Sequence, residues 1–302
     1  MSIGSEQAVV IWGEVLWDRF PDGDKLGGAP SNVAWHLGLA GGWARLVSRV
    51  GADEPGRRAI AQLSQVCDAD LVQIDADRGT GEVTVALEAG EPRYTLVPGR
   101  AWERIECTMD VAAAIAESGV LVYGTLAQHT DAGLAGWRAA IAAAQGQCLK
   151  VCDVNLRRTM TPPPGERRAV EEAIAAADIV KVNEAELARL AEWFGWGADP
   201  IARLREGKRV VAVTRGKHGS TLYADKETVD VTCVPARAGG DNVGCGDAYV
   251  AIFVHGMTLG WDLAASGAAA SRWAAAVAGE RGATPLFSDE RIDELLGETQ
   301  VE

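Results

Sequence analysis

Short runs of apolar, mostly β-branched residues recur along the chain, and longer stretches with helical spacing of apolar residues separate them. Runs of this kind occupy residues 9–12, 46–50, 71–74, 120–123, 149–154, 178–182 and 209–214. Runs that are apolar at nearly every position are typical of strands buried on both faces, as in parallel sheets. Strands that alternate with helices predict repeated β-α-β units. We therefore expect an α/β fold in which helices flank a doubly wound, mostly parallel sheet.

One segment breaks this rhythm. Apolar and polar side chains alternate strictly over residues 80–87, and they alternate again over residues 93–97 after a turn. This pattern predicts an antiparallel hairpin. A hairpin among β-α-β units seldom joins the parallel sheet, so we expect a separate flap of residues 80–103, joined by residues 15–28. Since no repeat or linker is visible, residues 1–302 are predicted to form a single domain that carries this flap as a lid.

Composition and charge narrow the class of protein. The chain has 302 residues, of which 48% are hydrophobic, and a net charge of −13. A nucleic-acid partner is not expected, because phosphate backbones are bound by clustered Lys and Arg and the chain has no such cluster. No apolar run reaches membrane-spanning length and the first residues do not resemble a secretion signal, so we expect a cytoplasmic protein with no membrane partner. The six cysteines lack zinc or disulfide spacing and are expected to be free thiols.

The most informative stretch is residues 241–249, Asp-Asn-Val-Gly-Cys-Gly-Asp-Ala-Tyr. Gly244, Cys245 and Gly246 allow backbone amides to turn inward at a helix N-terminus, where negative charge is favoured. Asp247 falls in the first turn of that helix, close enough to a bound anion to take a proton from an approaching nucleophile. This pattern indicates phosphoryl transfer. The alternative is that Asp247 only caps the helix.

Other polar residues follow predicted strands, at the edge where open α/β sheets bind ligands. Asn183 and Glu186 stand three residues apart at a helix start, so they face the same side and are candidate ligands of Mg²⁺. The alternative is a capping box, with Asn183 as the cap and Glu186 as its acid. Thr214 and Gly216 follow another strand and are candidate nucleotide contacts.

Near the N-terminus, Asp18 follows the first strand, and residues 27–32 read Gly-Gly-Ala-Pro-Ser-Asn. The glycines allow a ligand to approach the backbone closely. Ser31 or Asn32 is expected to cap the helix that follows. At a later strand end, Arg157 is suited to pair with an anion or a hydroxyl.

Together these residues resemble the ribokinase (pfkB) family of carbohydrate kinases, over nearly the whole chain. Three separated signatures agree in order and spacing, and their joint occurrence is far more specific than any one alone. They are Gly27-Gly28-Ala29-Pro30-Ser31-Asn32, Asn183-x-x-Glu186 and Asp241-x-x-Gly244-Cys245-Gly246-Asp247. The stretches most similar to the fructokinase branch are Gly13-Glu14, Ala101-Trp102 and Asp153-x-Asn155-Leu156-Arg157. The resemblance predicts a ribokinase-like fold with a small β-sheet lid.

The resemblance also implies an activity, an ATP-dependent transfer of phosphate to a hydroxyl of a small sugar, with fructose as the best single candidate. It assigns the base to Asp247 and the anion hole to the amides of Gly244, Cys245 and Gly246. It implies ATP with Mg²⁺, the metal served by Asn183 and Glu186 through water. The implied sugar contacts are Asp18, Gly28, Asn32, Asn155 and Arg157. The implied nucleotide contacts are Asn183, Thr214, Gly216 and Gly219.

Asp241 matches an acidic position that often helps to hold a monovalent cation, so potassium is a candidate cofactor. Some residues depart from the family pattern. Asn242 and Val243 stand where two threonines are common, and residues 270–273 lack an asparagine often found near the adenine, which leaves the preferred base open. Cys245 stands where alanine is common. Because it lies beside a helix N-terminus, we predict that its thiol has a lowered pKa and is protected by nucleotide.

The same sequence features fit other functions to different degrees. Ribose, a 2-keto-3-deoxy sugar acid or a nucleoside fits the same frame, since the family changes substrate through pocket and flap residues. A non-catalytic sugar- or nucleotide-binding regulator would be expected to lose Asp247 or a glycine of the anion hole, and neither is lost. A nicotinamide dehydrogenase would need Gly-x-Gly-x-x-Gly after the first strand, which is absent.

The flap also predicts a quaternary contact. A hairpin by itself is marginally stable in water. We therefore expect its apolar side chains to meet a second copy of the chain in a homodimer, through Val83, Val85, Tyr94 and Leu96.

Overall fold

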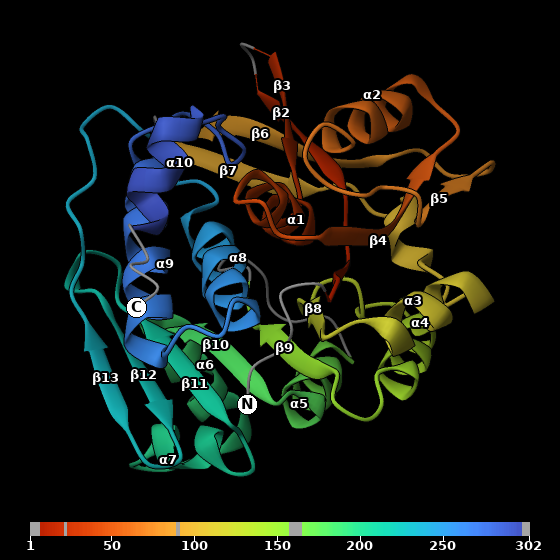
Figure 1. Cartoon of the computed structure of the whole chain (residues 1–302). Coiled ribbons are helices and arrows are strands. Elements are labelled where there is room, and N and C mark those ends of the chain that lie inside the picture. The colour runs from red at the N-terminus through yellow and green to blue at the C-terminus, as the bar shows by residue number, and fades with distance from the viewer. Residues whose placement is uncertain (1–6, 21–22, 89–90, 157–164, 298–302) are drawn as a thin grey trace.

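The computed structural model describes residues 7–20, 23–88, 91–156 and 165–297, with side chains outside 85–94. Its main sheet has nine strands in the order β13-β12-β11-β10-β9-β8-β1-β4-β5 (Figure 1). These strands are β1 Val9–Trp12, β4 Ala44–Gly51, β5 Val72–Asp75, β8 Val120–Tyr123, β9 Leu149–Asp153, β10 Ile179–Asn183, β11 Val210–Thr214, β12 Ser220–Ala224 and β13 Thr228–Val231. All pairs from β11 to β5 are parallel, while β12 and β13 are antiparallel. The predicted α/β class is confirmed.

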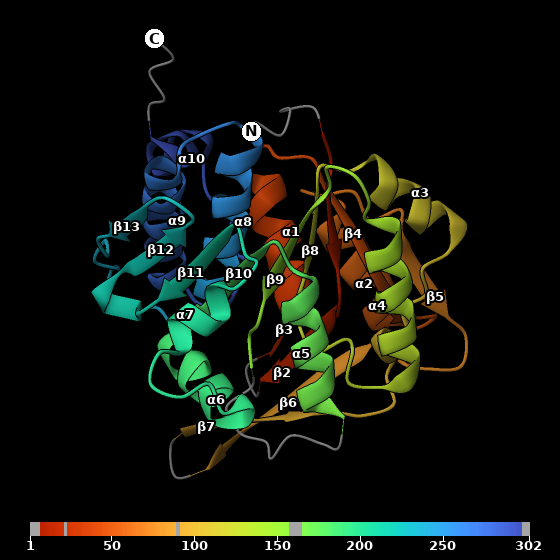
Figure 2. The same ribbon diagram turned by 90° about the horizontal axis from the view of Figure 1, so that it is seen from below.

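Helices cover both faces of this sheet, as Figure 2 shows. They are α1 Ala29–Leu39, α2 Glu54–Leu63, α3 Met109–Glu117, α4 Asp131–Ala143, α5 Glu166–Ala176, α6 Glu184–Phe194, α7 Pro200–Arg205, α8 Cys245–Thr258, α9 Leu263–Ala278 and α10 Asp289–Leu296. Alternate residues of a strand point to opposite faces. Accordingly Val9 and Ile11 enter the core under α1, α8 and α9, whereas Val10 and Trp12 enter the core under α3 to α7.

A second sheet has four strands in the order β3-β2-β6-β7. Its strands are β2 Leu16–Phe20, β3 Gly23–Gly27, β6 Gly81–Glu88 and β7 Glu91–Leu96. The pairs β6–β7 and β2–β3 are antiparallel and β2–β6 is parallel, so the predicted hairpin and its link to the N-terminal segment are confirmed. Val83 was expected at a dimer contact. In the single chain its side chain is already buried, with 8% of its surface exposed and no second subunit present. The side chains of Val85 and Tyr94 lie outside those described.

Helix α1 begins earlier than the sequence predicted. Its N-cap is Gly28, and Pro30 falls in the first turn, where its fixed φ favours helix entry. Ser31 and Asn32 therefore lie inside the helix and are buried, so the expectation that one of them caps it is wrong.

The strand order reverses between β1 and β8, which is the position where open α/β sheets form a ligand crevice. No helix in the described ranges combines the length and apolar character needed to span a bilayer.

Candidate active site

Asp247 lies in the first turn of α8 and is buried, with 8% of its surface exposed. Two asparagine amides hold its carboxylate. Asn32 Nδ2 on α1 donates to Asp247 Oδ2 at 2.7 Å, and Asn155 Nδ2, in the segment after β9, donates to Asp247 Oδ1 at 3.4 Å. Asn155 adopts a left-handed backbone with φ of 41°, which asparagine tolerates better than most residues. Amide donors orient this carboxylate without protonating it, so the arrangement suits a proton acceptor.

The backbone before Asp247 is shaped by glycines. Gly244 is the N-cap of α8 with φ of 78°, a left-handed conformation that glycine adopts without strain. A Cβ at Gly244 would lie 2.6 Å from Ala283 Cβ, and a Cβ at Gly246 would lie 3.0 Å from Lys181 Nζ. Gly244 is therefore closed to side chains, whereas a side chain at Gly246 would have to push the Lys181 ammonium aside. The amides at this helix start lie at the positive end of the helix dipole, which favours an anion.

Cys245 does not have the reactive thiol that its position predicted. Burial, together with the nearby carboxylates of Asp247 and Asp241, raises the pKa of the Cys245 thiol to about 12. The helix N-terminus favours the thiolate, but desolvation outweighs it. The predicted lowering of this pKa is wrong, and all six cysteines are free thiols.

A buried ion pair lies beneath the start of α8. Lys181 Nζ on β10 is 2.9 Å from Asp153 Oδ1 on β9, and the two side chains are 8% and 4% exposed. Burial alone would lower the pKa of Lys181, but the carboxylates of Asp153, Glu186 and Asp247 raise it, so the ammonium stays charged. Asp153 Oδ2 finds no hydrogen-bond donor among the described residues. Lys181 was not among the residues predicted from the sequence, although a lysine inside an otherwise apolar strand was a signal for it.

Asn183 and Glu186 form a capping box at the start of α6. Asn183 Oδ1 accepts the Glu186 N–H at 2.9 Å, and Glu186 Oε2 accepts the Asn183 N–H at 2.8 Å. Burial raises the pKa of Glu186, although Lys181 opposes this effect. The capping box that was the alternative to a metal site is therefore formed, and it holds the Glu186 carboxylate near Lys181 and Asp153.

The predicted nucleotide contacts lie on neighbouring strand ends. Thr214, the last residue of β11, pairs in register with Asn183, the last residue of β10. Gly216 and Gly219 follow in the turn to β12, with φ of 52° and 80°. A Cβ at Gly219 would collide with the carbonyl oxygen of Val231, so this turn also requires glycine.

The predicted sugar contacts come from two regions. Asp18 lies on β2 of the small sheet, and its Oδ2 would be 2.5 Å from a Cβ at Gly27, next to the start of α1. Gly28 has φ of 101°, and a Cβ there would collide with the carbonyl oxygen of Glu14. The structure brings Asn32 and Asn155 together at Asp247, whereas Arg157 lies outside the described residues.

Asp241, the expected monovalent-cation residue, is already engaged. Its Oδ1 accepts the Val243 N–H at 3.1 Å, and its Oδ2 accepts the Gly282 N–H at 2.9 Å. Lys25 Nζ lies 3.9 Å from the same Oδ2. The charge of the Asp241 carboxylate is therefore already partly balanced by an ammonium at ion-pair distance.

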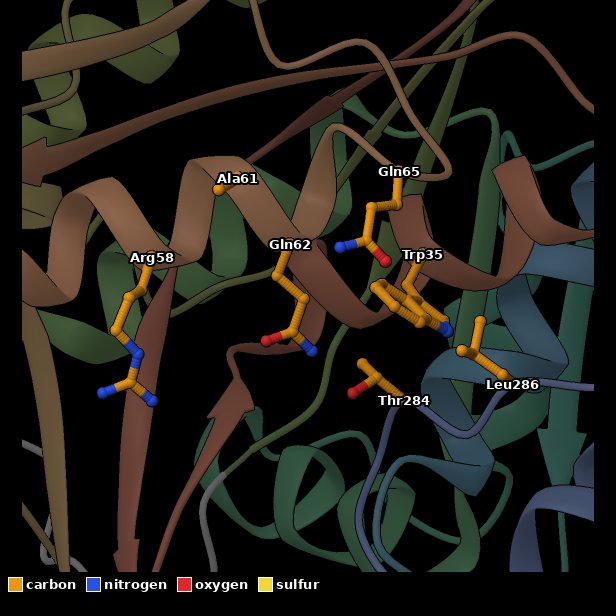
Figure 3. A pocket seen from close by; sticks show the side chains of 7 residues that line it. All are labelled: Trp35, Arg58, Ala61, Gln62, Gln65, Thr284 and Leu286. Carbon is orange, nitrogen blue, oxygen red and sulfur yellow. The ribbon is translucent and has the colours of Figure 1, made fainter.

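A surface pocket of about 410 Å³ lies between α1, α2 and the segment before α10 (Figure 3). None of the predicted site residues lines it. Its lining side chains are Trp35, Arg58, Ala61, Gln62, Gln65, Thr284 and Leu286.

Known proteins are similar to this chain in sequence and in fold. A sequence model described as pfkB family carbohydrate kinase matches residues 23–290. A protein of Pyrococcus horikoshii named as a sugar kinase is 30% identical over 93% of this chain and 87% of that protein. The structure of that protein in complex with ATP superposes with a TM-score of 0.80 at 26% identity, over 94% of this chain and 96% of that chain. Fructokinase-1 of rice, Oryza sativa subsp. japonica, is 31% identical over 82% of each chain. A Vibrio cholerae fructokinase with fructose, ADP and calcium bound has a TM-score of 0.80 at 24% identity, covering 97% and 100%.

Proposed function

Because the chain belongs to the pfkB family of carbohydrate kinases, we propose that it transfers the terminal phosphoryl group of ATP to a hydroxyl of fructose. Membership makes the protein a phosphotransferase that acts on a sugar. ATP as the donor is supported by the ATP-bound sugar kinase of P. horikoshii. Fructose as the acceptor is supported by the rice and Vibrio fructokinases.

The observation that carries this proposal is the carboxylate of Asp247 between two asparagines at the start of α8. The sugar hydroxyl attacks the γ-phosphorus, the bond to the bridging oxygen breaks, ADP leaves, and the hydroxyl proton passes to Asp247. Asn32 Oδ1 is buried and finds no donor within the described ranges, so a sugar hydroxyl that reached it on binding would satisfy it.

The charge that develops on the phosphoryl group meets groups that are already in place. We assign the anion hole to the amides of Gly244, Cys245 and Gly246, which need no rearrangement because the glycines fix the turn. The Lys181 ammonium lies close to Gly246 and adds a positive charge beneath the same turn.

The residues present fit a hydrated Mg²⁺ brought by the nucleotide. This ion prefers oxygen ligands and keeps several waters, using one or two carboxylates and the substrate phosphates. Among the described residues, no cluster of three or more His, Cys, Asp or Glu would hold a metal directly, whereas the Glu186 carboxylate and the unpaired Asp153 Oδ2 lie close together. Glu186 and Asn183 would hold the ion through water, and it would neutralise charge on the phosphates.

We assign Thr214, Gly216 and Gly219 to the nucleotide, because they lie at the strand end next to Asn183. We assign Asp18 and Gly28 to the sugar; this is supported by the position of Asp18 against Gly27, at the entry to the helix that carries Asn32. We also propose that copies of the chain associate through the small sheet. Light scattering that shows a monomer at working concentration would refute that association.

A substrate panel tests the activity. Transfer from labelled ATP would be measured with fructose, ribose, 2-keto-3-deoxygluconate and adenosine. We expect fructose to have the highest kcat/KM. A higher value for another acceptor would refute the assignment of fructose, and no transfer to any of them would refute the proposed kinase activity toward these compounds.

A matched pair of variants tests the base. Asp247→Asn keeps the shape of the side chain and removes its basicity, so kcat should fall about 10²- to 10⁴-fold with the fold intact. Asp131→Asn is the control, because Asp131 is an exposed acid in the first turn of α4. Equal turnover of Asp247→Asn and the parent would eliminate Asp247 as the base. If that variant lost turnover but kept its cellular role, a regulatory function would be favoured.

A further inference from the structure

One lysine of the small sheet reaches the loop that leads into the anion hole. Lys25 lies on β3, and its Nζ is 3.9 Å from Asp241 Oδ2. The lysine stem runs along Gly282, where a Cβ would lie 3.1 Å from Lys25 Cδ, and the ammonium lies 5.3 Å from the centre of the Phe20 ring. The ammonium thus lies near a carboxylate and an aromatic ring, while the lysine side chain stays about one-third exposed.

Asp241 joins the two loops that shape the start of α8. Its carboxylate binds the amide of Val243, directly before Gly244, and the amide of Gly282, directly before Ala283. Gly244 and Ala283 are packed so closely that no side chain fits at Gly244. The position of the anion-hole backbone therefore depends on the Asp241 carboxylate and on the charge beside it.

We propose that Lys25 is the resident monovalent cation of this active site. Its ammonium pairs with Asp241 and thereby holds residues 241–244 in place, so that phosphoryl transfer needs no added potassium. A free ion would have to compete with this ammonium for the charge of the Asp241 carboxylate, whose Oδ2 also accepts the Gly282 N–H. The pair also links the small sheet to the loop that leads into the anion hole. This inference rests on the proposed kinase activity.

The test compares the parent with Lys25→Met and Lys25→Arg in potassium, ammonium or choline chloride at constant ionic strength. Transfer of labelled phosphate to sugar is measured directly, so that no coupling enzyme adds its own need for a cation. The parent and Lys25→Arg should turn over equally in all three salts. In choline, turnover by Lys25→Met should fall about fivefold, the scale of a partly exposed ion pair, and potassium or ammonium should restore it.

A second measurement does not depend on activity. If Lys25→Met gains a cation site, potassium should raise its thermal unfolding midpoint above the value in choline, while the parent midpoint stays unchanged. The control variant is Lys226→Met, because Lys226 is exposed at the turn between β12 and β13.

Three results would overturn the inference. The first is a parent enzyme whose turnover rises severalfold with potassium. The second is Lys25→Met that equals the parent in choline. The third is a Lys25→Met defect that no cation restores, which would mean that Lys25 acts by packing and not by charge. A parent without any transferase activity would instead refute the proposed function, and the unfolding midpoints would still report on cation binding.

Discussion

His36 is expected to make the stability of this protein depend on pH. The residue is completely buried on α1, where Trp273 Nε1 donates to His36 Nδ1 at 3.1 Å and His36 Nε2 lies 2.9 Å from the carbonyl oxygen of Ala283. Since the indole N–H can only donate, Nδ1 must be the acceptor and Nε2 must carry the proton. A second proton on Nδ1 would face the indole donor. Burial lowers the pKa of His36 from 6.5 to about 4, although the Ala283 carbonyl partly opposes this.

The sign of the effect follows from the two states. The unfolded chain takes up a proton near pH 6.5 and the folded chain only near pH 4, so below pH 6.5 the unfolded state binds more protons. The stabilisation is complete above pH 6.5 and is lost as the pH falls toward 4. The gap between the two pKa values corresponds to about 3.4 kcal/mol, at 1.36 kcal/mol for each pKa unit. About 2 kcal/mol of this should be lost between about pH 7.5 and pH 5.

The assay is urea unfolding of the parent and of His36→Gln at a series of pH values between these limits. Glutamine can still offer one donor and one acceptor but does not titrate here. The advantage of the parent over His36→Gln should therefore shrink by about 2 kcal/mol between about pH 7.5 and pH 5. Effects of other groups, including His255, cancel in this difference. His218→Gln, at an exposed histidine, is the control. A difference that stays constant with pH would refute the reasoning.

Three further perturbations test the packing around the site. Lys181→Met should destabilise the protein by about 3–5 kcal/mol in urea unfolding, because it leaves the Asp153 carboxylate buried without its partner. Adding Asp153→Leu should recover most of the loss, and a loss under about 1 kcal/mol for Lys181→Met would contradict this reasoning. Gly246→Ala should lower kcat about tenfold or more while the unfolding midpoint changes little, because the new Cβ would press on the Lys181 ammonium beneath the anion hole. An unchanged kcat would show that the ammonium moves aside without affecting the anion hole. Asp53→Ala should lower the free energy of unfolding by about 2 kcal/mol, because the Asp53 carboxylate caps α2 through Gly56 and also binds Thr80. Unchanged stability in thermal unfolding would mean that water replaces both contacts.

These contacts also explain why the site residues come from distant parts of the chain. Asn32 and Asp247 are separated by 215 positions, and Asn155 and Asp247 by 92. Asn32 and Asp247 meet because α8 packs against α1, and Asn155 joins them from the end of β9, near the point where the strand order reverses.

The sequence alone determined the features whose causes are local. Apolar runs separated by amphipathic stretches predicted the strands and helices, and strict alternation predicted the hairpin of β6 and β7. Gly244, Gly246 and Asp247 lie within one turn of each other, so their spacing was enough to predict an anion-binding helix start with an acid in its first turn. The capping box of Asn183 and Glu186 was likewise visible, because its two residues are three positions apart.

Only the tertiary structure decided which charges meet and how deeply each group is buried. The partner of Lys181 depends on β9 lying beside β10, and the contact of Lys25 with Asp241 depends on where the small sheet lies relative to the loop before α8. Burial also reversed the prediction for Cys245, because desolvation of a thiolate outweighs the helix dipole. The physical reason is that pairing and desolvation depend on neighbours in space, and the sequence order does not state which segments become neighbours.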